Sequence, residues 1–335
     1  MNTPLLELRA VSKRFVKQLD FAARLGNVFG AGQREEVVHA VDGVSLAIAP
    51  GEVVGLVGES GCGKSTLGRM AVGLHTLSAG ERFLRGENVA ALQARLSRAE
   101  YRRQMLGIQM IFQDPYASLN PRLRVRDIVG EAPVAHGLIA RNEQDDYVAG
   151  LLSKVGLDAA FMRRYPHQFS GGQRARIGIA RALAVKPEFL VCDEAVAALD
   201  VSIQAQVLNL FIALRDELKL TYLFISHDLG VVRHLSDRVV IMYLGRVVES
   251  APADAVFAAP NHPYTQALLA EAPTLEVRKK TFVAIKGELP SPLAPPSGCH
   301  FHPRCPHAMQ RCKDEAPALR EIAAGWRSAC HLNAV

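Results

Sequence analysis

Two short segments of this sequence carry residue types suited to phosphate chemistry. The first, GESGCGKST at residues 58–66, combines three glycines with a lysine and adjacent hydroxyl side chains. Glycines let backbone N–H groups converge on phosphate oxygens, and a lysine at this spacing reaches the β- and γ-phosphates of a nucleotide. The second segment, SGGQ at residues 170–173, follows about a hundred residues later. Together the two segments predict a protein that binds a nucleotide through its phosphates.

The loop assigns a role to each of its side chains. Lys64 is expected to contact the phosphates, Ser65 to ligate Mg²⁺, and Thr66 to steady the loop. Cys62 is a loop position and not a candidate metal ligand. A glycine-rich turn with an incidental lysine is the alternative, and the complete nine-residue match argues against it. The other loop residues expected to surround the phosphates are Gly58, Ser60, Gly61, Cys62 and Gly63.

A pair of carboxylates follows the apolar run FLVC at residues 189–192. Asp193 can hold a metal, and Glu194 can orient or deprotonate an attacking water. We therefore assign Asp193 to Mg²⁺ and Glu194 as the general base. A solvated strand end with two acids is the alternative, which the apolar run and its position after SGGQ disfavour.

Two polar residues complete the candidate site. Gln113, in IFQDP at residues 111–115, has an amide that can contact Mg²⁺ or water. His227, in FISHD at residues 224–228, follows a second apolar run, and its imidazole can hydrogen-bond a γ-phosphate. Alone, Gln113 would be an ordinary loop residue and His227 a structural histidine; their order among the other motifs gives them significance.

The elements that must position these residues read as alternating strands and helices. The buried run at 53–57 predicts a strand leading into the phosphate loop, with a helix after it at 65–74. A stretch rich in helix formers, about 114–186, carries SGGQ. Further strands are predicted at 5–11, 44–48, 189–192 and 222–225, a helix at 202–218, a hairpin at 239–242 and 246–249, and a glycine-rich loop around 26–36.

Length and composition bound the protein class. The chain has 335 residues, 49% of them apolar and 21% charged, which suits a globular protein of about two domains. No apolar run approaches the length of a membrane span, and the amino terminus lacks a signal pattern, so we expect a cytoplasmic protein. Beyond residue 250 the composition shifts toward Pro, Ala and His, which predicts a boundary there.

The net charge of +6 does not by itself identify a partner. The densest basic stretch lies on a helix that a Ser97–Glu100 capping box begins, and a solvated helix face explains it better than nucleic acid does. Only 6% of residues are aromatic, so a nucleic-acid platform has little support and we expect no nucleic-acid partner. The basic residues are Arg95, Arg98, Arg102 and Arg103.

Cysteines gather at the carboxy terminus. Four of the six fall in residues 299–335, spaced C-x5-C-x6-C-x17-C. In a cytosolic protein such a group indicates metal binding more than disulfides. The spacing matches neither a paired zinc pattern nor a ferredoxin run. The four are Cys299, Cys305, Cys312 and Cys330.

The complete motif set resembles that of the ATP-binding cassette ATPases. The phosphate loop, Gln113, SGGQ, Asp193–Glu194, ALD at 198–200 and His227 occur in that family's order. Three further runs resemble its oligopeptide/dipeptide/nickel importer branch. These are FQDPYASLNP at 112–121, NHPYTQALL at 261–269 and GELPSP at 287–292.

The resemblance implies an α/β fold. The implied fold would be a P-loop NTPase cassette with an antiparallel β subdomain, a helical subdomain and a small Cys-rich C-terminal module. The cassette would span 1–250, with the helical subdomain at about 114–186, and an oligopeptide/dipeptide-transporter-type C-terminal domain would span 251–335. The cysteines resemble a set that holds a [4Fe-4S] cluster in some members of the branch. We favour that cluster slightly over Zn²⁺, with free thiols as the third possibility and with His300, His302, His307 and His331 as substitute ligands.

The resemblance also implies a shared active site. Two cassettes would dimerise head to tail, so that Ser170 and Gly172 donate to the γ-phosphate of the partner's ATP. Phe15 is the candidate for stacking on adenine, although it suits a core position equally well. The remaining nucleotide-contacting positions would be Gly171, Gln173 and Asp200.

Partners and localisation follow from the same resemblance. The chain would hydrolyse ATP beside a second, paralogous ATPase, beneath two permeases and with an extracytoplasmic solute-binding protein, at the cytoplasmic face of the inner membrane. Residues 116–126 are the candidate permease contact, or else a plain subdomain surface. Di- or oligopeptide is the expected solute, with nickel, glutathione and oligosaccharide as alternatives.

Two other function classes would leave different signs in the sequence. A soluble cassette ATPase acting on ribosomes or DNA damage would carry two cassettes or a coiled-coil insertion, and a regulatory metal or redox module would have lost nucleotide motifs.

The chain departs from the family at Ala195, where Pro is common, at Ala197, where Ser is common, and at Phe169, where Leu is common. We predict retained ATPase activity because every phosphate-contacting residue is present.

Overall fold

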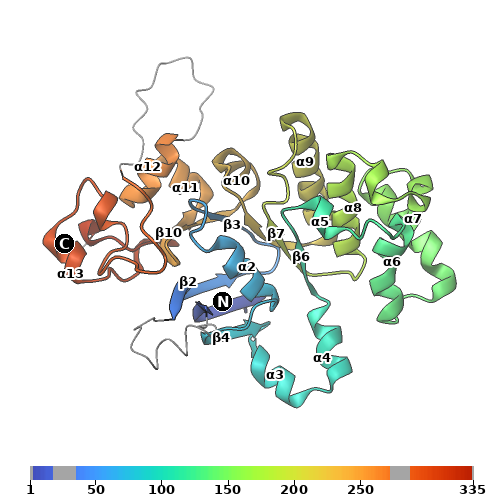
Figure 1. Ribbon diagram of the computed structural model, residues 1–335, viewed down its shortest axis with the longest axis horizontal. Helices are drawn as coiled ribbons and strands as arrows, with labels where there is room; N and C mark the ends of the chain where they lie inside the picture. The colour runs from blue at the N-terminus through green and yellow to red at the C-terminus, as the bar shows by residue number, and fades with distance from the viewer. Residues whose placement is uncertain (1–2, 18–34, 272–286, 334–335) are drawn as a thin grey trace, which may run out of the picture.

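The framework of the molecule is an eight-stranded mixed sheet (Figure 1). The computed structural model describes residues 3–17, 35–271 and 287–333. Strands β9, β3, β8, β7 and β6 run parallel, whereas β10, β12 and β11 are antiparallel additions at one edge. The sheet order is β11-β12-β10-β9-β3-β8-β7-β6. The strands are β3 (Val53–Val57), β6 (Ile108–Ile111), β7 (Phe189–Asp193), β8 (Thr221–Ile225), β9 (Arg238–Tyr243), β10 (Arg246–Pro252), β11 (Arg320–Ala323) and β12 (Trp326–Ser328).

The central strands are buried along their whole length. Every residue of β3, β7 and β8 is buried, as expected for parallel strands covered by helices on both faces. Continuous apolar runs therefore identified these three strands correctly, and the predicted hairpin is the antiparallel pair β9–β10. Strand β6 was not predicted, because only four residues, IQMI, form it and one of them is polar.

A second, four-stranded antiparallel sheet has the order β2-β1-β4-β5. This is the predicted antiparallel β subdomain. The predicted strand at 5–11 matches β1 from residue 6 onward, and the predicted strand at 44–48 lies within β2. The predicted loop at 26–36 falls outside the described residues from 26 to 34. Strand β4, AGERFL, was missed because it is largely exposed and shows no apolar alternation. The strands are β1 (Leu6–Lys17), β2 (Glu36–Ile48), β4 (Ala79–Leu84) and β5 (Glu87–Asn88).

The helices connect the strands as predicted in two places. Helix α2 (Lys64–Val72) begins inside the phosphate loop, and α9 (Val201–Leu218) connects β7 to β8. The predicted capping box is also present, since the Ser97 backbone N–H donates to the Glu100 carboxylate at 2.9 Å. Other helices are α3 (Val89–Arg95), α4 (Arg98–Met105), α10 (Leu229–Leu235), α11 (Ala253–Ala258), α12 (Pro263–Glu271), α13 (Gln310–Asp314), η4 (His302–Arg304) and η5 (His331–Asn333).

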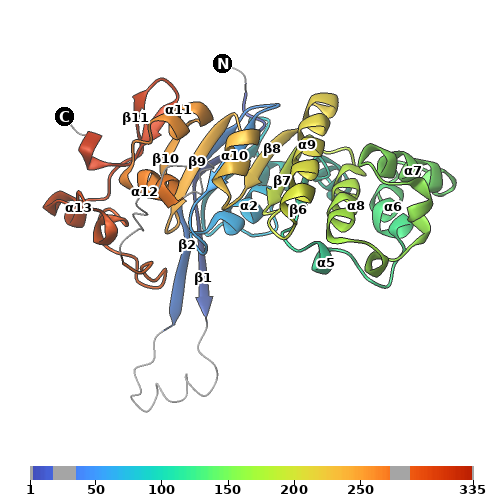
Figure 2. The same ribbon diagram turned by 90° about the horizontal axis from the view of Figure 1, so that it is seen from above.

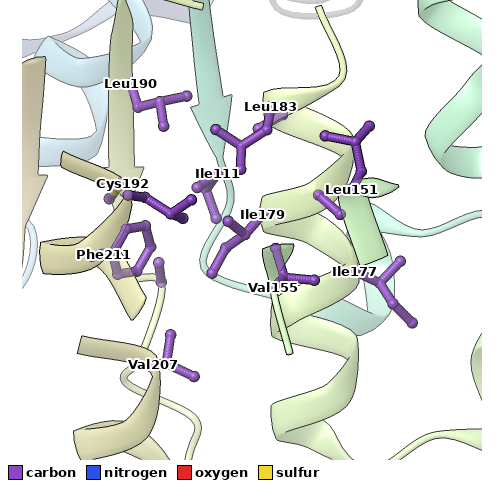
Figure 3. Packing of buried hydrophobic residues seen from close by; sticks show 14 of the residues in the cluster. Ile111, Leu151, Val155, Ile177, Ile179, Leu183, Leu190, Cys192, Val207 and Phe211 are labelled. Atoms are coloured by element: carbon purple, nitrogen blue, oxygen red, sulfur yellow. The ribbon is translucent and has the colours of Figure 1, made fainter. Parts of the chain in front are cut away.

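The stretch around 114–186 is helical and lies at one end of the molecule (Figure 2). Apolar residues of α7 and α8 pack with β6, β7 and α9 in one buried cluster, which includes Ile179, Leu190 and Phe211 (Figure 3). This packing fixes the helices to the edge of the large sheet. The elements are α5 (Pro115–Ser118), α6 (Val125–Ala135), η1 (Arg141–Glu143), α7 (Gln144–Lys154), η2 (Ala159–Arg163), η3 (Pro166–Gln168) and α8 (Gly171–Leu183).

The C-terminal region packs against the opposite edge of the sheet. Strand β12 pairs with β10 and β11 pairs with β12, so residues beyond 250 extend the central sheet. Three buried rings join the region to β9: Tyr243 lies 4.7 Å from Tyr264 and 5.3 Å from Phe301, between ring centroids. The division into 1–250 and 251–335 stays a prediction, and residue 250 itself falls within β10.

Among the described residues, no helix is long and apolar enough to cross a membrane.

Candidate nucleotide-binding site

The phosphate loop connects the buried strand β3 to helix α2. Lys64 is 4% exposed, and its Nζ donates to the carbonyl oxygens of Gly58 at 2.7 Å and Glu59 at 3.0 Å. Gly63 has φ +103°, and a Cβ there would meet the Ala40 carbonyl oxygen at 2.1 Å, so only glycine fits. The loop ends on the N-terminus of α2, whose positive dipole end favours anions.

A hydroxyl and a carboxylate meet beside this loop. The Ser65 hydroxyl donates to Asp193 Oδ1 at 2.7 Å, across 128 residues of sequence. Burial raises the pKa of Asp193, against which the Ser65 hydrogen bond and then the charge of Arg69 act to lower it. Oxygen atoms of hydroxyl and carboxylate groups are the ligands that Mg²⁺ prefers, so this pair fits the metal that accompanies ATP.

The Glu194 carboxylate is the meeting point of the predicted catalytic residues. Gln113 Nε2 donates to Glu194 Oε2 at 2.7 Å, and His227 Nδ1 lies 3.5 Å from the same oxygen. Glu194 itself has φ +48°, a conformation that non-glycine residues adopt rarely. Its N–H donates to the Ile225 carbonyl at 3.0 Å, which ties the strained residue to β8. The three residues can therefore act on one water molecule.

A cavity of about 370 Å³ lies over the loop. Its wall contains the predicted Phe15, which is 38% exposed and packs edge-on to His75 with 5.5 Å between centroids. That this ring stacks on adenine stays a prediction. Val38, Ala40 and Pro292 were not predicted to line the cavity. Val38 and Ala40 lie outside any motif, and Pro292 lies in the run at 287–292, but nothing local in the sequence indicates that these residues border a nucleotide. The complete lining is Phe15, Val38, Ala40, Ser60, Gly61, Gly63, Lys64, Ser65, Thr66, Gln113, Glu194 and Pro292.

SGGQ lies elsewhere, at the N-terminus of α8. Ser170 and Gln173 form a capping box, because each side chain accepts from the other residue's backbone N–H, at 3.3 Å and 3.1 Å. Gly172 packs so closely on α9 that a Cβ would lie 2.3 Å from Ile203 Cγ2. Neither residues 170–173 nor Asp200, the N-cap of α9, belong to the described lining of the cavity. Their contact with nucleotide stays a prediction.

The three departures from the family pattern leave the local structure intact. Ala195 is buried, and the backbone N–H of Ala197 donates to the Glu194 carbonyl at 3.1 Å. A backbone group makes that turn, so the turn does not require a hydroxyl at position 197. Phe169 is buried and packs edge-on to Phe161 with 5.5 Å between centroids.

The C-terminal cysteines do not form the predicted metal site. Among the described residues, no three or more His, Cys, Asp or Glu side chains are arranged to hold a metal ion. The [4Fe-4S] cluster is therefore unsupported, and so is the Zn²⁺ alternative. Burial raises the pKa of the Cys299 thiol to about 11 and also raises the pKa of Cys305 and Cys330. Cys299, Cys305, Cys312 and Cys330 form no disulfide in the structure.

The histidines considered as substitute ligands have other roles. His300 Nδ1 donates to the Leu244 carbonyl at 3.1 Å, which anchors the C-terminal region to the β9–β10 turn. His302 Nδ1 donates to the Cys299 carbonyl at 2.9 Å, and His331 Nε2 donates to a backbone carbonyl at 2.9 Å. Each of these three therefore commits one ring nitrogen to the backbone.

Known proteins resemble the chain along nearly its whole length. The ABC transporter family matches residues 41–197, and the family described as "Oligopeptide/dipeptide transporter, C-terminal region" matches residues 248–312. The chain is 48% identical to the oligopeptide transport ATP-binding protein AppF of Bacillus subtilis, over 98% of this chain and 97% of the relative. It is 44% identical to the dipeptide transport ATP-binding protein DppF of Haemophilus influenzae, over 98% and 97%.

Solved structures share the cassette. The protein cbiO1 of Clostridium perfringens, part of the ABC transporter complex cbiONQ, superimposes with a TM-score of 0.61 and 25% identity over 77% of this chain and 92% of that one. The ATP-binding cassette MJ0796, solved as a dimer with ADP and Pi, gives a TM-score of 0.60 and 25% identity over 74% and 98%. The chain therefore belongs to the ATP-hydrolysing subunits of the oligopeptide and dipeptide ABC transporters.

Proposed function

We propose that this chain hydrolyses ATP to power the import of di- or oligopeptides through a pair of membrane permeases. The observation that carries the proposal is the single cavity in which Lys64, Ser65, Gln113 and Glu194 meet. Relatives that share nearly the full length of the chain are peptide-transport proteins by name, which supports peptide over nickel, glutathione or oligosaccharide.

The geometry supports a separate role in ATP hydrolysis for each side chain of the site. Lys64 leaves its two carbonyl partners to neutralise phosphate charge, while the loop N–H groups and the α2 N-terminus cradle the same anion. Ser65 and Asp193 would hold Mg²⁺, which when bound would neutralise charge on the phosphates. Glu194 accepts a proton from the attacking water, and Gln113, which is hydrogen-bonded to the same carboxylate, helps to orient that water.

The dimer completes the site from a partner cassette. Ser170 and Gly172 lie outside the chain's own cavity, as expected if they serve a partner's ATP, with Gly171 and Gln173 forming the same helix start. The related cassette MJ0796 was solved as a dimer, which supports this arrangement. We infer that the partner is a paralogous ATPase and that Asp200 faces the shared interface.

A second, mostly apolar cavity of about 380 Å³ suits a permease segment. It lies between β6, the end of α2 and helices α6 and α8, and it includes Phe112, the neighbour of Gln113. An apolar segment pressing on Phe112 would shift Gln113 and with it the hydrogen bond to Glu194. The contact predicted at 116–126 adjoins this region in sequence.

A chain that binds permeases would lie at the cytoplasmic face of the inner membrane, with a solute-binding protein on the other side.

Co-purification tests the proposed solute. The chain would be expressed with its neighbouring permeases and binding protein, and the ligand retained by the binding protein would be identified by mass spectrometry. We expect peptides of two to several residues. Recovery of nickel, glutathione or an oligosaccharide as the bound solute would refute peptide import, and purification of the chain free of any permease would favour a soluble cassette ATPase.

A further inference from the structure

The phosphate loop is held by residues far along the chain. Glu59, the second residue of the loop, receives the guanidinium of Arg304 on both carboxylate oxygens, at 2.7 Å and 3.1 Å. The Arg304 side chain is 7% exposed and that of Glu59 is 22% exposed. A two-point contact of this kind fixes orientation as well as distance, and its burial keeps it from being screened as surface pairs are.

A second C-terminal residue holds the backbone of the same loop residue. The Glu59 N–H donates to the Tyr264 hydroxyl at 2.8 Å. Tyr264 lies on α12 and is fully buried, and its ring packs on Tyr243 and Phe301 with 4.7 Å and 5.4 Å between centroids. The hydroxyl is therefore fixed in place by the aromatic cluster that anchors the C-terminal region.

The third contact of Glu59 leads to the phosphate-binding lysine. Lys64 Nζ donates to the Glu59 carbonyl oxygen at 3.0 Å. The side chain, N–H and carbonyl of one residue thus connect Arg304 and Tyr264 to Lys64. Any shift of Glu59 changes where the Lys64 ammonium lies before nucleotide arrives.

The C-terminal segment reaches the nucleotide cavity at one more place. Pro292 is part of the cavity wall, and its carbonyl accepts from the backbone N–H of His39 at 3.1 Å. His39 belongs to β2, which also supplies Val38 and Ala40 to the wall. The region beyond residue 250 therefore borders the cavity as well as the loop.

We propose that Arg304 and Tyr264 are positioning residues for ATP binding, which set the shape of the phosphate loop through Glu59. They act on the nucleotide only through the loop. A purely structural role would instead make the pair an anchor for the C-terminal region, with no influence on the affinity for ATP. The two roles predict different results, because an anchor changes the stability of the free protein whereas a positioning residue changes the response to nucleotide.

The test uses the full chain with Mg²⁺–ATP as the probe. Dissociation constants would be measured calorimetrically for wild type, Arg304→Gln, Glu59→Gln and the double variant, and melting temperatures would be recorded with and without ATP. We expect each single variant to weaken ATP binding about tenfold, as loss of a supporting contact around a site does. The double variant should bind no more weakly than either single one, because both remove the same contact.

Arg311→Gln is the matched control. Arg311 also pairs with a glutamate in the C-terminal region, Glu315, through an exposed contact at 2.8 Å that does not touch the loop. Its ATP affinity should equal that of wild type. Arg304→Lys keeps the charge but loses the two-point geometry, so its affinity should fall between those of Arg304→Gln and wild type.

Two outcomes would overturn the proposal. One is an Arg304→Gln protein that melts at a lower temperature yet binds ATP within twofold of wild type. The other is additivity, in which the double variant is weakened by the product of the single effects. Should Arg304→Gln fail to fold, Tyr264→Phe removes only the hydroxyl acceptor and should weaken ATP binding about fivefold; unchanged binding there would refute the proposal equally.

Discussion

The Glu194 carboxylate brings together three segments that are far apart in sequence. Gln113, Glu194 and His227 each follow a strand, namely β6, β7 and β8, and these strands are neighbours and parallel in the large sheet. The carboxyl ends of parallel strands meet at one edge, which is where ligands bind in open α/β sheets. Three residues that are far apart in the sequence therefore lie together at this edge of the sheet.

Glu194→Gln tests the general base. The amide keeps the shape and can still contact Gln113, but it cannot accept a proton from water, so kcat should fall about a thousandfold while ATP still binds. Steady-state phosphate release by the assembled transporter, together with ATP affinity, measures both quantities. Hydrolysis at the wild-type rate would remove the assignment.

Phe15→Ala tests the aromatic wall of the cavity. Loss of a stacking ring should weaken ATP binding by about 1–3 kcal/mol. Val16→Ala is the matched control, since Val16 is a neighbouring exposed apolar residue, 49% exposed, that does not line the described cavity. Calorimetry with ATP separates the two, and equal losses in both variants would show that Phe15 only supports β1.

The residues that sequence could not predict are those whose roles depend on distant packing. Glu59 is an unremarkable position within a motif, and only the fold brings Arg304 to it across 245 residues. Pro292 stood in a run that identified the family branch, yet nothing local indicated that it lines the nucleotide cavity. The four cysteines are the opposite case. Their grouping in the sequence predicted a metal site, but the described residues are not arranged to hold a metal ion.

Helix α12 begins with a titratable cap. His262 is 1% exposed, its ring Nδ1 accepts from the Tyr264 backbone N–H at 3.0 Å, and its backbone N–H donates to the buried Glu249 carboxylate at 2.9 Å. Burial lowers the pKa of His262 to about 4. The folded chain therefore keeps this imidazole neutral in mildly acidic solution, whereas the unfolded chain protonates it.

That difference predicts a pH dependence of stability. The contribution of His262 to the free energy of unfolding is fully present above about pH 6.5. It is lost as the pH falls toward 4, and the loss is at most about 3 kcal/mol. In His262→Asn the side-chain oxygen can accept the same backbone N–H without titrating, so the free energy of unfolding should fall less steeply between pH 7 and pH 4. Chemical denaturation at several pH values measures the slopes, and identical slopes would contradict the prediction.

Gly172→Ala tests the packing of α8 on α9. The added methyl would overlap Ile203, so the variant should lose about 1–3 kcal/mol of unfolding free energy. Gly172→Ala combined with Ile203→Ala should regain part of the loss, relative to Ile203→Ala alone, because the methyl then has space. Gly178→Ala on the same helix, where nothing lies within 4 Å, is the control and should not be destabilised. A loss in that control equal to the one in Gly172→Ala would refute the steric explanation.

Elements with a continuous apolar run or a cap were predictable, and elements defined by pairing were not. Strands β3, β7 and β8 are buried on both faces, and they can be predicted because their sequences are largely apolar runs. Strands β11 and β12 are short and largely polar, and they exist because β10 offers an edge with which to pair. No local periodicity encodes such a strand, since its stability comes from the neighbour.

At the scale of the whole molecule, the helical region and the C-terminal region occupy opposite ends of the large sheet (Figure 2). The nucleotide cavity is bordered by the sheet, by the antiparallel β subdomain and by Pro292 of the C-terminal segment. Motion at the phosphates can therefore reach both the helical end, through Gln113 and Phe112, and the C-terminal end, through Glu59.

ATP-powered peptide import is tested most directly by peptide uptake into proteoliposomes that contain this chain, its partner ATPase, the permeases and the binding protein. Wild-type transporter should accumulate labelled di- or oligopeptide only when ATP is present on the cassette side. The Glu194→Gln transporter should bind ATP but accumulate no peptide. Uptake by Glu194→Gln at the wild-type rate, or no ATP-dependent uptake by the wild type, would contradict the claim that hydrolysis at this site powers import.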